Sequence, residues 1–206
     1  MSMLLMLKEG STLGIDGPPI DLPDTPSGNG KLTLIETVTL SSDTAEIEFA
    51  NLQTDIYNTH HIIGELPVSG TDGNEYEIRI QYTVGGTRIE SGNQYSNTFV
   101  QIKAGSGARS TRISTANFHL PREQFDDPAA ERSTNINNVI HNLGSTTLAK
   151  VQEFRSSSHA TAANSRQSIG GFMFNNTSAV EKIHWYTTAT NGFAAGARLS
   201  LYGYAE

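Results

Sequence analysis

Residues 75–84 read EYEIRIQYTV, and polar and apolar side chains alternate along this stretch without a break. A period of two places successive side chains on opposite faces of an extended strand. One face takes the apolar side chains of Tyr76, Ile78, Ile80, Tyr82 and Val84. The other face takes Glu75, Glu77, Arg79, Gln81 and Thr83. The stretch therefore predicts a β-strand with one face in a core and the other in water.

Similar short runs, rich in β-branched residues, recur from Lys31 onward. Clusters such as TDGN, VGGT and TNG separate them and predict turns. No segment shows a sustained helical period, and no internal repeat is visible. The expected further strands cover 31–40, 45–52, 59–66, 97–103, 113–120, 135–142, 146–156, 168–175, 180–188 and 197–204.

Short strands at this spacing are typical of two packed antiparallel sheets. We therefore expect an all-β fold, a two-sheet antiparallel β-sandwich that is jelly-roll-like and carries an extended N-terminal arm. A Greek-key barrel is the nearest alternative. The final stretch, residues 183–206, has two alternating runs around Asn191 and Gly192, and it predicts a plain hairpin.

The composition excludes several classes of function. The formal net charge of the 206-residue chain is -7, with 14 Lys and Arg against 21 Asp and Glu, so its field opposes phosphate backbones and anionic lipid. We expect no nucleic-acid partner and no membrane association. The absence of cysteine excludes disulfides, thiolate metal sites and thiol catalysis.

Proline marks a boundary near residue 30. Four of the seven prolines lie within 17–30, where they fix φ and remove backbone donors. We expect an extended arm over 1–30 and a β-sandwich domain over 31–206, although a disordered tail has a similar composition. The apolar run 3–7 lacks the length and the preceding charge of a signal peptide, so we expect a soluble chain made without export. The predicted partner-binding residues of the arm are Met3, Leu4, Leu5, Leu7, Ile15, Ile20 and Leu22.

Histidines offer the most obvious candidates for a metal site. In THHIIGE, residues 59–65, His60 and His61 are adjacent and project to opposite faces of a strand, so they cannot both bind one ion from regular β geometry. The other histidines have no carboxylate or second histidine at ligand spacing, and we interpret them as ordinary polar residues. They are His119, His141, His159 and His184.

Carboxylates give no stronger signal for a site. Asp72, Asn74 and Glu75 could donate oxygens to calcium, but TDGN is first a hairpin signal. Asp126 and Asp127 precede a proline in a polar segment, where acidic pairs are usually only solvated. No G-x-S-x-G motif is present. The sequence therefore predicts no catalytic residue, no metal and no cofactor.

Trp185 and Tyr186 are adjacent on one expected strand. One of them must face the core and the other must face outward or into an interface. An exposed aromatic ring could stack on a sugar, but a tryptophan in the sandwich core is the simpler interpretation.

Residues 45–66 read AEIEFANLQTDIYNTHHIIGEL, and residues 169–206 read IGGFMFNNTSAVEKIHWYTTATNGFAAGARLSLYGYAE. Together these two stretches resemble structural proteins encoded by tailed bacteriophages. The resemblance covers about 32–204 in the order of elements, and its motifs are short and mostly structural. It implies a jelly-roll virion component and transfers no catalytic residue. One departure is that Asn191 precedes Gly192, an order that suits a type I′ turn equally well. The matching residues are Ile47, Phe49, Asn51, Leu52 and Tyr57, then Gly192, Phe193, Gly196, Leu201, Tyr202 and Gly203.

The leading hypothesis is a non-enzymatic capsid decoration or cement protein, located in the virion and assembled in the host cytoplasm. Its expected partners are its own copies, preferably as a homotrimer, and the major capsid protein or other virion proteins. The alternative is a tail-fibre or receptor-binding module that contacts host glycans through 91–97 and 156–168, which are rich in Ser, Asn, Gly and Gln. A polysaccharide depolymerase ranks last, because no pair of acids marks a catalytic groove.

Overall fold

The computed structural model describes residues 31–69, 74–90, 94–103, 107–115, 118–119, 123–125, 133–159 and 165–205. These residues form strands and connecting turns and contain no helix, so the predicted all-β class is confirmed. None of the described segments is a helix that could cross a membrane. The predicted arm, with its partner-binding residues, lies outside the described residues, as do Asp72, Asp126 and Asp127.

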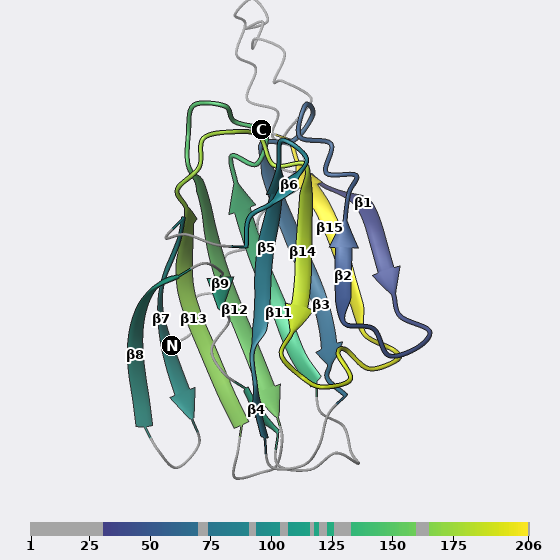
Figure 1. The fold of residues 1–206 in the computed structure, drawn as a ribbon, viewed down its shortest axis with the longest axis vertical. Helices are drawn as coiled ribbons and strands as arrows, with labels where there is room; N and C mark the ends of the chain where they lie inside the picture. Colours follow the sequence, from purple (N-terminus) through teal and green to yellow (C-terminus); the bar gives the residue numbers. More distant parts are fainter. Residues whose placement is uncertain are drawn as a thin grey trace, which may run out of the picture.

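Eight strands form the larger of two antiparallel sheets (Figure 1). Each strand pairs with its neighbours through an antiparallel ladder. In spatial order they are β1 (Leu32–Thr39), β15 (Arg198–Tyr204), β3 (Thr59–Pro67), β11 (Ser133–His141), β12 (Lys150–His159), β13 (Ser165–Phe174), β7 (Tyr95–Lys103) and β8 (Gly107–Thr115).

Five strands form the smaller sheet, which lies in front of the larger one in Figure 1. β5 pairs with β14 on one side and with both β6 and β9 on the other. The strands are β2 (Glu46–Phe49), β14 (Lys182–Thr187), β5 (Ile78–Val84), β6 (Thr87–Arg88) and β9 (Phe118–His119). A separate two-stranded ladder joins β4 (Asn74–Tyr76) to β10 (Glu123–Phe125).

Strands from the two ends of the described chain are neighbours in both sheets. β15 lies between β1 and β3 in the larger sheet, and β14 lies between β2 and β5 in the smaller one. The chain therefore crosses from sheet to sheet as it passes from β1 to β2, β3 and β5, and again from β14 to β15. This connectivity is that of a jelly roll. The predicted two-sheet sandwich is confirmed, and β12, β13, β7 and β8 extend its larger sheet beyond β11.

Alternate side chains of the two sheets meet in a core between them. Burying each large apolar side chain contributes about 1.5–3 kcal/mol to stability. The prediction that Trp185 faces the core is confirmed, because it is fully buried while Tyr186 is only half-buried on the outer face. The largest fully buried aromatic side chains are Trp185, Tyr82, Tyr95, Phe49, Phe154, Phe174 and Phe193.

A hydrogen bond between β5 of the smaller sheet and β12 of the larger sheet joins the two layers. The hydroxyl of Tyr82 on β5 donates to Oε1 of Gln152 on β12 at 2.8 Å. The ring of Phe174 stacks on Tyr95 at 4.8 Å and meets Tyr82 edge-on at 5.1 Å. Burial raises the pKa of both tyrosine hydroxyls. These phenols therefore stay neutral, and they fix the spacing of the sheets by contact and hydrogen bonding.

The predicted C-terminal hairpin over 183–206 is wrong. β14 belongs to the smaller sheet and β15 to the larger, so the two strands do not pair. The predicted type I′ turn is also wrong, because Gly192 has a positive φ of 81° and Asn191 does not. The connection instead carries buried Phe193, whose backbone N–H donates to the carbonyl of Thr44 at 2.8 Å. Contact with a distant segment thus replaces local strand pairing.

The polar face predicted to be in water is largely covered. Glu77, Gln81 and Thr83 are buried, with exposures of 8, 4 and 7%. The prediction of a solvated face therefore fails, although its apolar partner face is confirmed as core. The cover comes from neighbouring polar side chains, since Arg88 bonds Gln81 and His184 bonds Thr83.

Gly203 on β15 lies directly against the ring of Tyr57, and a Cβ at this position would overlap the ring atoms. We predict that Gly203→Ala lowers the free energy of unfolding by about 1–3 kcal/mol, because the tyrosine or the strand must move. Urea denaturation measures the change. Ser41→Ala is the control, since Ser41 is exposed in a bend outside the core. Equal stability of the two variants would contradict the prediction.

Candidate functional site

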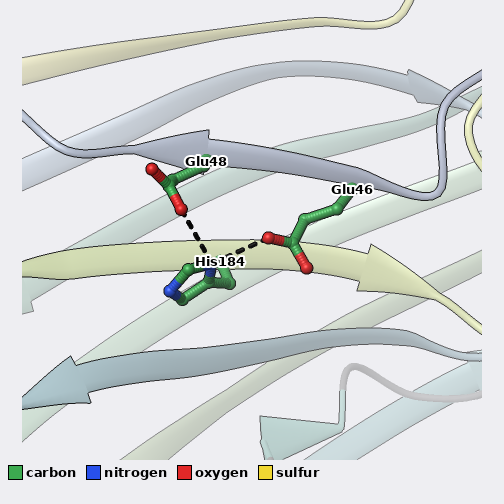
Figure 2. A group of neighbouring side chains, drawn as sticks. All are labelled: Glu46, Glu48 and His184. Carbon is green, nitrogen blue, oxygen red and sulfur yellow. Dashed lines mark hydrogen bonds and ion pairs between the residues drawn. The ribbon is translucent and has the colours of Figure 1, made fainter. Parts of the chain in front are cut away.

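A buried histidine on the outer face of the smaller sheet lies between two carboxylates. His184 Nδ1 is 2.8 Å from Oε1 of Glu46 and 3.4 Å from Oε2 of Glu48 (Figure 2). The imidazole is 6% exposed, and the two carboxylate side chains are 29 and 37% exposed. The other ring nitrogen, Nε2, is 2.7 Å from Oγ1 of Thr83. Both nitrogens of this ring are therefore engaged.

Strand register places these three residues together. Glu46 and Glu48 are alternate residues of β2 and share its outer face, while Ile47 between them is buried in the core. His184 lies directly opposite Glu48 in the β2–β14 ladder. The carboxylates therefore project over the imidazole from a neighbouring strand, as Figure 2 shows.

Cations hold the outer oxygens of both carboxylates. Arg88 Nη1 is 2.5 Å from Oε2 of Glu46, and Lys182 Nζ donates to Oε1 of Glu48 at 2.9 Å. The same arginine lies over the ring of Tyr186, 5.2 Å from its centroid. Burial raises the pKa of this tyrosine hydroxyl. Each carboxylate thus presents one oxygen to the histidine and the other to a cation.

The prediction that His184 has no carboxylate at ligand spacing is wrong. No carboxylate is close to it in the sequence pattern, but the fold brings Glu46 and Glu48 next to its imidazole. The carboxylates come from residues 138 and 136 positions earlier in the chain, so no local pattern around the histidine reveals them. The available signal is the alternation Glu46-Ile47-Glu48, which places two acids on one strand face. Pairing this strand with the correct histidine strand requires the fold.

The histidines of β3 diverge as predicted. His60 is fully buried, and its Nε2 is 2.6 Å from the carbonyl oxygen of Leu52. Burial lowers the pKa of His60. His61 lies on the opposite face, with Nε2 2.8 Å from Oδ1 of Asn137. No single ion can be bound by both imidazoles in this arrangement.

The remaining candidates are dispersed. His141 Nδ1 is 3.1 Å from Oγ1 of Thr59. His119 and His159 lie on β9 and β12, and Asn74 and Glu75 lie on β4 rather than in a loop. None of these residues lies on β2 or β14, the strands that carry the cluster around His184.

The outer face of the larger sheet carries an apolar stripe. We use this name for five large side chains on β12, β13 and β7 that are between 42 and 57% exposed. Two of the pairs face each other directly in the ladders, Val151 with Met173 and Ile169 with Val100. Contiguous exposed apolar area on a sheet face is typical of a surface that contacts a partner. The stripe consists of Val100, Ile102, Val151, Ile169 and Met173.

A hollow interrupts the apolar stripe at Gly171. This residue faces outward between Ile169 and Met173, and its missing side chain leaves a depression of about 500 Å³ bordered by Ser96 and Thr98. Glu153 lies opposite Gly171 on β12 and is exposed. The face thus offers an apolar rim with a recess for a partner side chain.

A second depression of about 360 Å³ lies where β11, β12 and β13 meet the end of β7. The segment 156–168, predicted as a glycan-binding loop, is mostly strand: only 160–164 lie outside the described residues. In 91–97, Tyr95, Ser96 and Asn97 likewise belong to β7. The depression is lined by one apolar residue and six polar ones: Ile102, Asn135, Ser157, Ser158, Ser165, Arg166 and Gln167.

No protein-family model matches the chain, and no curated protein matches it. Among solved structures, the chain is similar to the CBM2 module of the evolved Dit of Lactobacillus casei BL23 phage J-1. The match covers 87% of this chain and 81% of that chain, at 9% identity and a TM-score of 0.26. These comparisons assign the chain to no family.

Proposed function

We propose that this chain is a non-enzymatic structural protein of a tailed-bacteriophage virion, specifically a capsid decoration or cement protein. The observation that carries the proposal is the apolar stripe with its recess at Gly171, because exposed apolar area of this kind serves contact between proteins. On this proposal the protein acts in the virion, where it forms a contact that holds subunits together.

The resemblance to phage structural proteins supports the proposal through the fold. Ile47, Phe49 and Leu52 are core residues. Gly192 and Gly196 have positive φ values of 81° and 90°, which favour glycine. The matched positions therefore specify a rigid body, and the contacts of that body lie on its surface.

The partner that we propose for the apolar stripe is a second copy of this chain. Glu153 and Arg155 are both exposed on β12 beside the stripe, so the face carries an acid and a base. A face with both signs of charge can pair with charged groups of either sign on a neighbouring copy. A homotrimer is our preferred assembly because it suits the three-fold positions of a capsid lattice.

Charge placed in the apolar stripe is expected to separate the subunits. We predict that the double variant Val100→Lys, Ile169→Lys sediments as a monomer in analytical ultracentrifugation, whereas the unmodified chain sediments as an oligomer. Two facing lysines would have to lose water in the contact and would repel each other.

Ile56→Lys is the matched control, because Ile56 is 61% exposed and lies away from the stripe in a turn before β3. This control is expected to keep the mass of the unmodified oligomer. A monomeric unmodified chain at high concentration, or an oligomer that survives both lysines, would overturn the proposed contact.

Residues 1–30 are proposed to fasten the protein to the capsid. We predict that replacing Leu4, Leu5, Ile20 and Leu22 together by serine weakens co-sedimentation with empty capsids at least tenfold, because each loses apolar area that would be buried on the partner. The mass of the free protein should not change. Unchanged capsid binding would refute the role of the arm and leave the apolar stripe unaffected.

A glycan-binding module is the second candidate, and the polar depression of about 360 Å³ favours it. Serine, arginine and glutamine side chains there supply donors and acceptors suited to sugar hydroxyls.

A glycan array with the purified chain tests this candidate. Binding of a host glycan that falls at least tenfold in Gln167→Ala would support it. The control is Gln53→Ala, which lies outside the depression. An array without signal at high protein concentration would remove the candidate.

A further inference from the structure

The cluster on the outer face of the smaller sheet has the geometry of a cation site. His184 Nδ1, Glu46 Oε1 and Glu48 Oε2 all lie within 4.8 Å of one another. Donor atoms bound to one tetrahedral zinc ion are separated by roughly 3.3 Å, given bonds of about 2.0–2.1 Å. The observed separations of 2.8 and 3.4 Å from the imidazole to the two carboxylates bracket this value.

The residues behind the three donor atoms fit the same interpretation. The outer nitrogen of the imidazole is 2.7 Å from the hydroxyl of Thr83, which can accept its N–H and leave Nδ1 free to bind an ion. Arg88 and Lys182 hold the carboxylate oxygens that face away from the histidine. All three donor groups are therefore oriented by a second contact, as the ligands of metal sites commonly are.

Access also suits a divalent cation. Arg88 and Lys182 already pair with one oxygen of each carboxylate, so each carboxylate can offer its inner oxygen to an ion. The imidazole is buried, whereas Glu46 and Glu48 are about a third exposed, so an ion can enter from solvent between them. One nitrogen and two oxygen donors suit zinc or a neighbouring first-row metal better than magnesium or calcium.

We propose that Glu46, Glu48 and His184 bind one divalent transition-metal cation, represented by Zn²⁺, which clamps β2 to β14. β2 is a four-residue edge strand, and an ion shared with the central strand would fix its position. The role is structural, and it is independent of the apolar stripe on the other sheet. The competing explanation is an imidazole whose Nδ1–H donates to the carboxylates without any metal.

Calorimetry on the tag-free full chain, after treatment with EDTA, tests the proposal. We expect one Zn²⁺ to bind per chain and Tm to rise by about 5–10 °C at a metal concentration a hundred times Kd, with reversal by EDTA. Co²⁺ should bind in place of Zn²⁺ and give the visible absorption of a tetrahedral nitrogen and oxygen site.

Two variants connect the binding to these residues. Glu48→Gln keeps the shape of the side chain but removes its charge, and it should weaken Zn²⁺ binding at least tenfold. His184→Gln should abolish the Co²⁺ absorption. If this variant fails to fold, Glu48→Gln still tests whether the cluster binds the metal. His61→Gln is the matched control, because it removes an imidazole from the other sheet, and it should leave binding unchanged.

Three results would overturn the site. They are an unmodified chain that binds no Zn²⁺, binding that persists in Glu48→Gln at full strength, and binding that His61→Gln reduces as strongly as Glu48→Gln does. The first result would leave the cluster as a histidine hydrogen-bonded to the carboxylates. The other two would place the bound metal elsewhere on the chain.

Discussion

The insertion of the last two strands between earlier ones is the constraint on which the rest of the structure depends. β14 separates β2 from β5 and β15 separates β1 from β3, so neither sheet can close before residues 182–204 are in place. Pairing of this kind has a high loop-closure cost and delays folding relative to local hairpins. The same insertion brings His184 beneath the carboxylates of β2. The polar cluster therefore exists only in the complete fold.

The two outer faces of the sandwich differ in polarity. On the smaller sheet the outer face is polar, and its side chains bond one another, because Arg88 and His184 contact residues on both β2 and β5. On the larger sheet the outer face is apolar and exposed around Ile169. Water solvates the first face readily and the second poorly. On the proposed function, the first face needs no cover and the second is covered by another subunit.

Local periodicity predicts which side chains enter the core, and it predicts little else. The alternation through Ile78 and Ile80 locates a core face correctly because burial acts residue by residue. It cannot assign strands to sheets, since that depends on contacts between residues far apart in sequence, such as Glu46 with His184. It also misplaces the strand expected at 113–120: β8 begins at Gly107, where GARSTR has no apolar alternation and pairing with β7 defines the strand.

Polar side chains buried behind the apolar stripe affect the stability of the larger sheet. Within the described residues, Thr134 Oγ1, Ser156 Oγ, Ser168 Oγ and both amide atoms of Asn138 are buried without a hydrogen-bond partner. Each such group either costs about 1–3 kcal/mol or holds an ordered water. They lie on β11, β12 and β13, and two of these strands carry the apolar stripe on their other face. If a second copy covers the apolar stripe, as proposed, it covers the part of the sheet that its own core stabilises least, and association would then stabilise the local fold there.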